Sequence, residues 1–213
     1  WFWYWMRSRH ISSHGTSMEG GKHKNTAIDC DHSIKKFDYL YLNKQTRIHR
    51  VKLWGDLHNS KLLDNSLISF LGANPPVRLD PEYELPWVDT KNYPMHGMDQ
   101  DFYTKPYEHA ACSIISETND NDEIFITEKL WKPILCQHFF IVHGNHLYLQ
   151  KIRELGFKTF GNYFDESYDL EPDPMKRTEK IVKLIASNYD LFWSDSAYEK
   201  EVQKTVADLL GLQ

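Results

Sequence analysis

Apolar residues fall into short runs that alternate with stretches of helical spacing from residue 37 onward. FDYLYLN (37–43) and SLISF (66–70) are typical of buried strands, and RIHRVKLWGDL (47–57) between them has apolar residues near helical spacing. The same alternation returns later, and its predicted elements are a strand at 111–117, a helix beginning at Thr127, a strand at 139–144, a helix at 146–156 and a strand at 157–160. Strands separated by helices in this way predict an α/β fold with a Rossmann-like, doubly wound parallel sheet.

The rest of the chain divides into a linker, an excursion and further helical stretches. Residues 1–36 predict an N-terminal linker or the remnant of an upstream segment, so that a single domain occupies 37–213. Residues 71–108 hold six of the nine prolines and predict a long irregular excursion. Gly156 suits the position just after a helix end. Helical periodicity also marks two further stretches, 174–189 and 195–210.

Composition indicates a soluble globular protein. The 213 residues are 41% hydrophobic, and the net charge of −5 argues against bulk attraction to nucleic acid or anionic lipid, so any phosphate recognition must be local. No apolar stretch reaches transmembrane length, and three scattered cysteines favour a reducing, intracellular (cytoplasmic) compartment. The opening WFWYWMRSRH has no initiator Met, so we expect a missing upstream segment. Its aromatics predict packing on a neighbouring domain or a second copy of the chain, with a membrane interface as the alternative.

Two predicted strand-to-helix junctions place cations where a helix begins. Arg47 and Arg50 follow the strand at 37–43, and Lys129 lies two residues after Thr127. A cation there costs about 0.3–1 kcal/mol against the helix dipole, whereas a bound anion reverses the sign. Ligands of open α/β sheets bind beyond the carboxyl ends of the strands, where strand order reverses and helix N–H groups favour phosphate. The two junctions therefore predict a diphosphate site, with solvated surface cations as the alternative.

Two longer stretches around these junctions resemble a known family. ACSIISETNDNDEIFITEKLWKPILCQHFFIVHG and LNKQTRIHRVKLWGDL are similar to the donor-binding motifs of the α1,3-fucosyltransferases. In that family a strand ending in an acidic turn leads to a Tyr-Val-Thr-Glu-Lys-type helix start. The resemblance spans roughly 37–190 and is dense at 43–57 and 112–144. GFKTF and DESYD, which follow, make the chain similar to virus- and phage-type glycosyltransferase-like proteins as well.

The resemblance implies that this chain is mostly the C-terminal, donor-binding domain of a GT-B glycosyltransferase. The implied reaction is sugar transfer from a nucleoside diphosphate sugar, with a guanosine diphosphate (GDP) sugar favoured, to a hydroxyl of a glycan or glycoprotein. It would proceed with inversion and without an obligatory metal or other cofactor, because fixed cations stabilise the leaving diphosphate. The implied catalytic residues are Lys129, Arg47 and Glu117, with Glu117 near the donor sugar. The implied donor-binding residues are Arg50, Asn43, Thr127, Glu128 and Phe125, with Arg50 as the alternative to Arg47 and Glu128 bonding sugar hydroxyls.

The sequence departs from the family pattern at several points. Phe125 lacks the hydroxyl of the family's aromatic, and Thr118 follows Glu117 where Asn is usual, so the donor stays open. The family's general base belongs to an N-terminal domain that residues 1–36 are too short to supply. The base is therefore either absent or provided by another part, such as an upstream acceptor-binding domain. Pro133, inside the predicted helix, removes a hydrogen bond and predicts a kink.

Two other functions stay open at this point. The first is a non-catalytic module that binds a nucleotide sugar or a glycan and has no general base. The second is a metal-dependent, GT-A-type transferase in which Asp29 and Asp31 of DCDH hold a divalent cation on the diphosphate. Metal dependence separates the second from the others, and turnover separates a transferase from a binding module.

Several polar residues after the second junction have competing interpretations. His138, His143 and His146 lie at opposite ends of a predicted strand, which favours surface or core positions over a zinc site. The acids of DESYD (165–169) either cap a helix or line the cleft. Tyr168 within it is more typical of a core aromatic than of a residue that stacks on a base.

Overall fold

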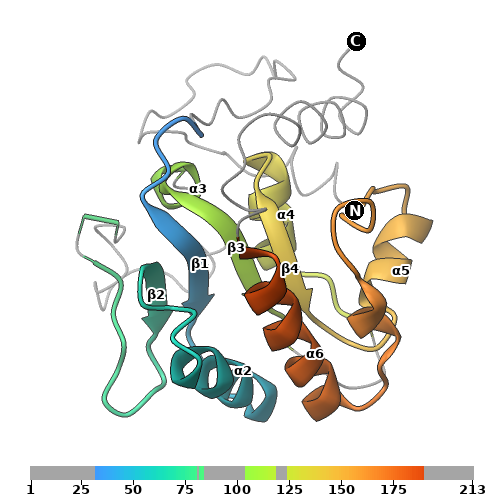
Figure 1. Cartoon of the computed structure of the whole chain (residues 1–213), viewed down its shortest axis with the longest axis horizontal. Coiled ribbons are helices and arrows are strands. Elements are labelled where there is room, and N and C mark those ends of the chain that lie inside the picture. The colour runs from blue at the N-terminus through green and yellow to red at the C-terminus, as the bar shows by residue number, and fades with distance from the viewer. Residues whose placement is uncertain (1–31, 81, 84–103, 119–123, 190–213) are drawn as a thin grey trace, which may run out of the picture.

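A parallel four-stranded sheet forms the centre of the protein (Figure 1). The computed structural model describes residues 32–80, 82–83, 104–118 and 124–189. The strands are β1 (Phe37–Asn43), β2 (Ser66–Phe70), β3 (Ala110–Ser116) and β4 (Phe139–His143). They lie in the order β2-β1-β3-β4, and every neighbouring pair is parallel. The chain first adds a strand on one side of β1 and later on the other, so the strand order reverses between β1 and β3.

The burial of the strands explains why they are parallel and central. All seven residues of β3 and all five of β4 are buried. Continuous apolar runs of this kind are typical of parallel strands covered on both faces. The register aligns Tyr41 with Ile68 of β2 and with Ile114 of β3. The carboxyl ends of β1 and β3 therefore lie side by side where the strand order reverses.

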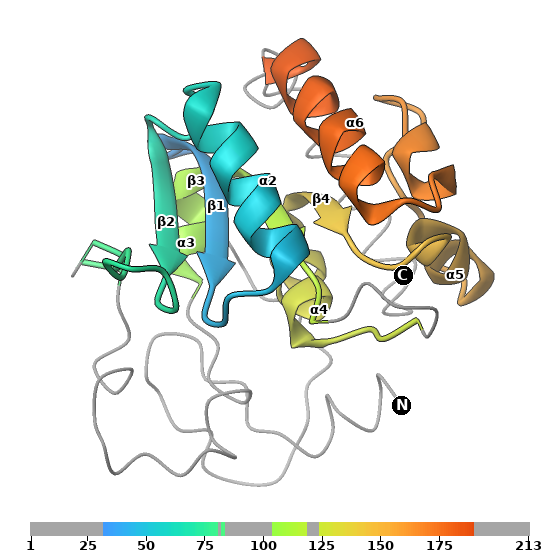
Figure 2. The ribbon, with the colours of Figure 1, turned by 90° about the horizontal axis from the view of Figure 1, so that it is seen from below.

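Helices cover both faces of the sheet (Figures 1 and 2). α2 (Ile48–Asn59) and α6 (Pro174–Ser187) lie together on one face, and α4 (Glu128–Leu135) lies on the other. α6 begins as its sequence predicts, because the Asp173 side chain caps the N–H groups of Met175 and Lys176. The remaining helical elements are α3 (Lys105–His109), α5 (Tyr148–Glu154) and the 3-10 helix η1 (Ser167–Leu170). The arrangement confirms an α/β fold with a parallel, Rossmann-like sheet.

The main core cluster joins strands β1, β3 and β4 to side chains of α2, α4, α5 and α6. Alternate residues of β1 point to opposite faces, so Tyr39 and Tyr41 join this main core, whereas Leu40 joins a smaller cluster on the other face. The smaller cluster consists of Leu40, Leu67, Tyr83, Tyr107, Ala110 and Cys136. Two of its residues, Leu40 and Tyr107, also line the candidate site.

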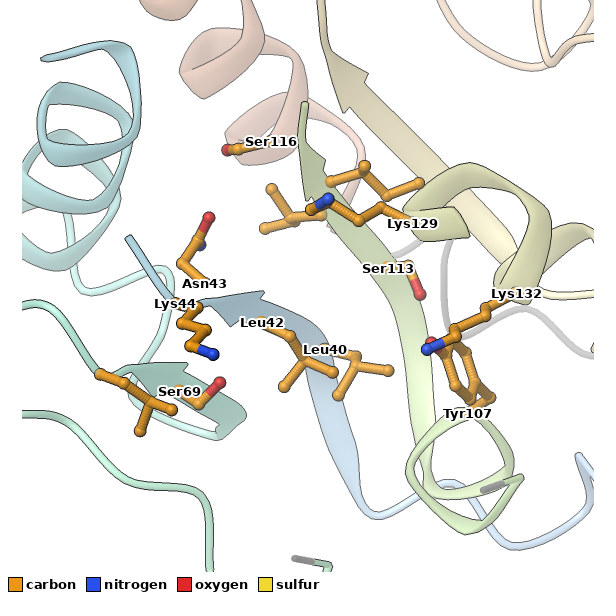
Figure 3. A pocket seen from close by; sticks show the side chains of 13 residues that line it. Leu40, Leu42, Asn43, Lys44, Ser69, Tyr107, Ser113, Ser116, Lys129 and Lys132 are labelled. Atoms are coloured by element: carbon orange, nitrogen blue, oxygen red, sulfur yellow. The ribbon is translucent and has the colours of Figure 1, made fainter. Parts of the chain in front are cut away.

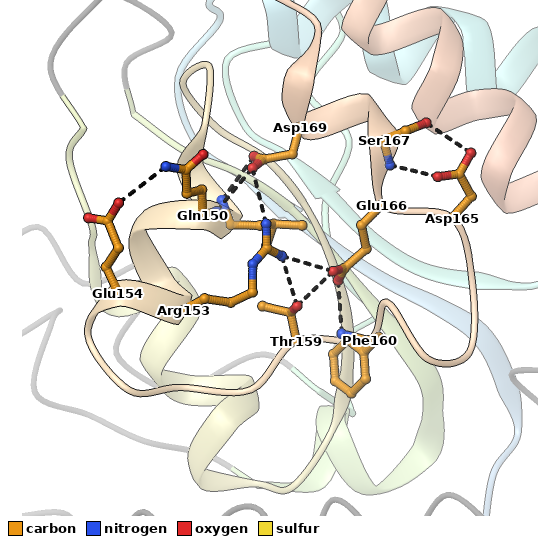
Figure 4. Close-up of polar contacts among 10 residues, drawn as sticks. Gln150, Arg153, Glu154, Thr159, Phe160, Asp165, Glu166, Ser167 and Asp169 are labelled. Atoms are coloured by element: carbon orange, nitrogen blue, oxygen red, sulfur yellow. Dashed lines mark hydrogen bonds and ion pairs between the residues drawn. The ribbon is translucent and has the colours of Figure 1, made fainter.

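The DESYD stretch caps a helix, as one of its two interpretations predicted (Figure 4). The Asp169 carboxylate accepts hydrogen bonds from the N–H groups of Leu149 (2.9 Å) and Gln150 (3.0 Å) in the first turn of α5. Tyr168 is buried in the core, in agreement with its preferred interpretation. Gly156, with a φ of 92°, follows the end of α5 as expected.

Two sequence predictions about local structure are wrong. The predicted strand at 157–160 is not a strand, because the Phe160 N–H donates to the Glu166 carboxylate (2.8 Å, Figure 4) and its ring packs on those of Phe139 and Phe140. The aromatic pattern there reflects packing of a loop onto the core. The excursion at 71–108 is not irregular throughout, since its end forms α3.

Several predictions fall on parts of the chain outside the described residues. These are the helix at 195–210, the N-terminal aromatics and linker, and the DCDH motif with Asp29 and Asp31. Among the helices that the structure does describe, none combines the length and the apolar character that a membrane crossing requires.

Candidate functional site

A pocket of about 260 Å³ runs along the α4 face of the sheet from the carboxyl ends of β1 and β3 (Figure 3). Leucine and isoleucine side chains from β1 and β3 form its floor, and hydroxyl groups and lysines surround them. The described lining residues are Leu40, Leu42, Asn43, Lys44, Ser69, Leu71, Tyr107, Ser113, Ile114, Ile115, Ser116, Lys129 and Lys132. The pocket therefore lies where strand order reverses, the usual ligand position in open α/β sheets.

The described lining of this pocket is basic. Lys44 follows the end of β1, and Lys129 and Lys132 lie one turn apart on α4. No Asp or Glu occurs among the described lining residues, although the whole chain has a net charge of −5. Three cations that share a partly enclosed space attract an anion more strongly than they would in bulk water. The local charge balance thus favours a ligand that carries more than one negative charge.

Asn43 lies at the end of β1, next to the pocket. The residue is the last of β1, lines the pocket and is only 4% exposed. Neither the nitrogen nor the oxygen of its side-chain amide has a hydrogen-bond partner among the described residues. The Tyr41 hydroxyl interacts with Asn43, but outside hydrogen-bond geometry. Both amide atoms are fully buried, so the amide is enclosed beside the pocket and does not open into it.

Lys129 lies in the first turn of α4, as the sequence predicts. Thr127 is the N-cap residue, and its hydroxyl oxygen accepts a hydrogen bond from the Lys129 N–H (3.3 Å). The Lys129 ammonium donates to the same oxygen and to the Thr118 hydroxyl, at 3.3 Å each. Figure 3 shows this side chain extending over the end of β3, toward the side where Asn43 and Ser116 lie. An anion at this place would meet both the ammonium group and the positive end of the helix.

Glu117 is buried beneath this helix start and does not line the pocket. Glu117 is fully buried, with 0% exposure, and its carboxylate accepts four hydrogen bonds. The donors are the Thr118 N–H, the N–H and hydroxyl of Thr127, and the Tyr148 hydroxyl. These four bonds use the hydrogen-bonding capacity of a carboxylate.

The two arginines of the first junction lie outside the described pocket lining. Arg50 is 4% exposed, and its guanidinium donates to the carbonyl oxygens of Ser116 (3.2 Å), Glu117 (2.9 Å) and Gln45 (3.3 Å). It therefore ties α2 to the carboxyl end of β3. Arg47 is the N-cap residue of α2, is exposed, and donates to the Gln45 side chain (3.4 Å). Of the predicted site residues, the structure brings Asn43 and Lys129 together in the pocket.

The remaining predicted residues surround the start of α4. Thr127 is buried and caps the helix, and Glu128 is its first residue. Phe125 precedes them with 50% exposure, and its N–H donates to the Asn145 side-chain oxygen (3.4 Å). Pro133 lies inside α4 as expected, and the helix ends two residues later at Leu135.

Sequence reasoning missed two of the three pocket lysines. Lys44 comes directly after the last residue of a buried strand, and Lys132 follows Lys129 at a spacing of three on the same helix. The end of a parallel strand and the i, i+3 spacing were the available signals. Neither signal shows by itself that a side chain faces a pocket.

Of the three histidines at β4 and its flanks, His138 and His143 are buried and His146 is exposed, as the sequence favoured. His138 is buried, and its Nε2 meets the Ala110 carbonyl oxygen (2.6 Å) while its Nδ1 meets the Ser113 hydroxyl (2.8 Å). Because a carbonyl oxygen only accepts, Nε2 carries the proton and Ser113 donates to Nδ1. Burial, with a smaller effect of His32, lowers the pKa of His138 to about 3. The described residues contain no group of three or more His, Cys, Asp or Glu side chains placed to hold a metal ion.

Comparison with protein-family models, curated proteins and solved structures finds no match to this chain. The observations on the molecule itself define an α/β protein with a parallel, Rossmann-like sheet and a basic pocket at the carboxyl ends of its central strands.

Proposed function

We propose that this chain is the donor-binding domain of a GT-B-type glycosyltransferase and holds a nucleoside diphosphate sugar in the pocket described above. The observation that carries the proposal is a pocket at the reversal of strand order whose described lining has three lysines and no acid. The sequence resemblance to α1,3-fucosyltransferases supports this ligand class and favours a GDP-sugar as donor.

The proposed chemistry uses the lysines to stabilise a leaving group. An acceptor hydroxyl oxygen attacks the anomeric carbon of the sugar, and the bond to the diphosphate oxygen breaks with its electron pair remaining on the diphosphate. The growing negative charge would lie near Lys129 and the first N–H groups of α4, which stabilise it more in the transition state than in the ground state. The proton of the acceptor hydroxyl goes to a general base in another part of the full protein, for which we propose an upstream acceptor-binding domain.

The pocket volume sets how much of the donor the described residues enclose. At about 260 Å³ it lies just below the range of about 300–1,000 Å³ common for small-molecule sites. We therefore assign it to the diphosphate and the groups next to it. The apolar floor of Leu40, Leu42 and Ile115 offers a surface for a ring beside the charged groups.

A non-catalytic nucleotide-sugar-binding module is the second candidate. It is favoured by the absence of carboxylate and imidazole side chains from the described pocket lining, where a general base would be needed. The two candidates share the ligand and differ in turnover. Transfer or hydrolysis of a nucleotide sugar by the full protein separates them.

The proposal is tested by ligand binding in EDTA. Thermal melting and calorimetry of the full chain with guanosine, uridine, cytidine and adenosine diphosphates should identify at least one that binds without metal. Lys129→Ala should weaken that binding about 10- to 100-fold, because a charge-assisted hydrogen bond contributes about 1.5–3 kcal/mol. The matched control is Lys151→Ala on α5, where the lysine pairs with Glu154 away from the pocket. Binding that is absent for the whole panel, or equal in Lys129→Ala and wild type, would refute the proposal.

A further inference from the structure

A chain of hydrogen bonds connects the buried carboxylate of Glu117 to the pocket lysine. We propose that Glu117 is a positioning residue: it fixes the direction of the Thr127 hydroxyl and thereby holds the Lys129 ammonium over the end of β3. The inference rests on the proposed function in so far as Lys129 binds the donor diphosphate. It assigns Glu117 a role different from the contact with the donor sugar that the sequence resemblance implies.

The hydrogen bonds around the Glu117 carboxylate all run in one direction. The Thr127 hydroxyl donates to Oε2 at 2.6 Å, and the Tyr148 hydroxyl donates to Oε1 at 2.7 Å. The backbone N–H groups of Thr127 and Thr118 donate to the same two oxygens, at 3.1 and 3.3 Å. Every partner of the carboxylate is thus a donor, all four bonds are charge-assisted, and the two shortest come from hydroxyl groups.

The bond to Glu117 fixes the direction of the Thr127 hydroxyl. A hydroxyl has one proton, and that of Thr127 is given to Glu117. Its lone pairs therefore remain for the Lys129 N–H and the Lys129 ammonium, both at 3.3 Å. The carboxylate makes the Thr127 oxygen an acceptor toward α4. The same oxygen caps the helix and holds the cation in place.

The backbone of Glu117 is hydrogen-bonded to α2 and to the end of β4. The Glu117 carbonyl oxygen accepts from His49 (3.0 Å) and Arg50 (2.9 Å) of α2, and its N–H donates to the His143 carbonyl (3.0 Å). Both the backbone and the side chain of Glu117 are therefore held, which keeps the carboxylate under the helix start.

Gly144 provides the space that Tyr148 needs on the other side of the carboxylate. A Cβ atom at Gly144 would come within 2.5 Å of the Tyr148 ring, far inside van der Waals contact. The glycine after β4 thus lets Tyr148 reach Glu117. The arrangement couples β4, β3 and the start of α4 to the position of one ammonium group.

Glutamine in place of Glu117 tests the direction of these bonds at nearly constant shape. One carboxylate oxygen becomes an NH₂ group, which donates where a hydroxyl or N–H also donates. To relieve that conflict at Oε2, the Thr127 hydroxyl must accept from Gln and turn its own proton toward Lys129, which repels the ammonium. We expect Glu117→Gln to release the Lys129 ammonium although the fold is kept.

The experiment follows the ammonium group directly, without any ligand. In the full chain labelled with ¹⁵N-lysine, NMR of the ammonium groups should show a distinct, slowly exchanging Lys129 signal, assigned by its loss in Lys129→Ala. This signal should move to the position of exposed lysines in Glu117→Gln and in Thr127→Val, and stay in Thr127→Ser, which keeps the hydroxyl. Where Glu117→Gln fails to fold, the Thr127 pair gives the same comparison.

A second readout is the affinity for the nucleoside diphosphate that binds best. We expect about tenfold weaker binding in Glu117→Gln and Thr127→Val and near-wild-type binding in Thr127→Ser. A lowered melting temperature with an unchanged Lys129 signal would overturn the positioning role and leave the proposed function standing. A Lys129 signal that responds as expected, in a chain that binds no nucleotide, would support the positioning role and refute the proposed function.

Discussion

Acidification should destabilise this protein through His138. The imidazole is 2% exposed, donates from Nε2 to the Ala110 carbonyl and accepts at Nδ1 from Ser113. A proton on Nδ1 would face the Ser113 hydroxyl proton in a buried place, and burial lowers the pKa of His138 to about 3. In the unfolded chain the pKa returns to about 6.5. The unfolded state therefore binds a proton that the folded state does not bind between pH 6.5 and about 3.

The size of the effect follows from proton linkage. Because the unfolded state binds more protons, the free energy of unfolding falls as pH decreases through this window, by about 1.4 kcal/mol per pH unit for one group. Between pH 7.5 and pH 4.5 His138 alone should remove roughly 2–3 kcal/mol, a large part of the roughly 5–15 kcal/mol typical of a domain. Other buried groups add their own pH dependence, so the comparison must isolate this residue.

Urea unfolding at pH 7.5, 6.5, 5.5 and 4.5 of wild type and His138→Gln provides that comparison. Gln keeps a donor near the Ala110 carbonyl and an acceptor for Ser113, but it does not titrate. The variant should be less stable at pH 7.5, and the difference from wild type should shrink by roughly 2–3 kcal/mol at pH 4.5. Parallel pH profiles for the two proteins would show that His138 is not held neutral in the folded state.

Two further substitutions test the pocket and its support. Lys132→Ala and Lys44→Ala should each weaken binding of the best nucleoside diphosphate about 3- to 30-fold and reduce the salt dependence of that binding. The control Lys151→Ala should change neither. Wild-type affinity of either pocket variant in calorimetry would show that its lysine does not contact the ligand. Arg50→Lys should lower the free energy of unfolding by about 2–3 kcal/mol, because one ammonium cannot replace a guanidinium bonded to three carbonyls. The control Arg47→Lys, at an exposed position, should change it by less than about 0.5 kcal/mol. Similar urea midpoints for the two variants would contradict the role of Arg50.

The main elements of the sheet could be predicted because burial leaves a clear pattern. β3 and β4 are buried at every position, and such runs between helical stretches indicate parallel strands. The same signal misled at 157–160, where aromatic side chains pack on the core from a loop. Apolar content reports burial, and it does not report whether the backbone finds a strand to pair with.

The candidate site was harder to predict because its partners come from distant parts of the chain. A cation in the first turn of a helix needs compensation, and the sequence suggested an anion for both Arg50 and Lys129. The structure instead gives the Arg50 guanidinium backbone carbonyl partners at Ser116 and Glu117, at the carboxyl end of β3. Lys132 shows the converse limit, because only the packing of α4 on the sheet places it beside Leu40 and Tyr107.

The position of the pocket between β1 and β3 has a consequence for how the site comes into being. Asn43 and Lys44 belong to the first half of the chain, Lys129 and Lys132 to the second, and the two halves meet only where β1 pairs with β3. Such a long-range pairing is slow to form, because closing the intervening loop costs entropy before any contact compensates it. Neither half alone can present the basic pocket, so a ligand that binds there selects the completed fold. Occupancy of the pocket would then slow global unfolding and protect both halves together from proteolysis.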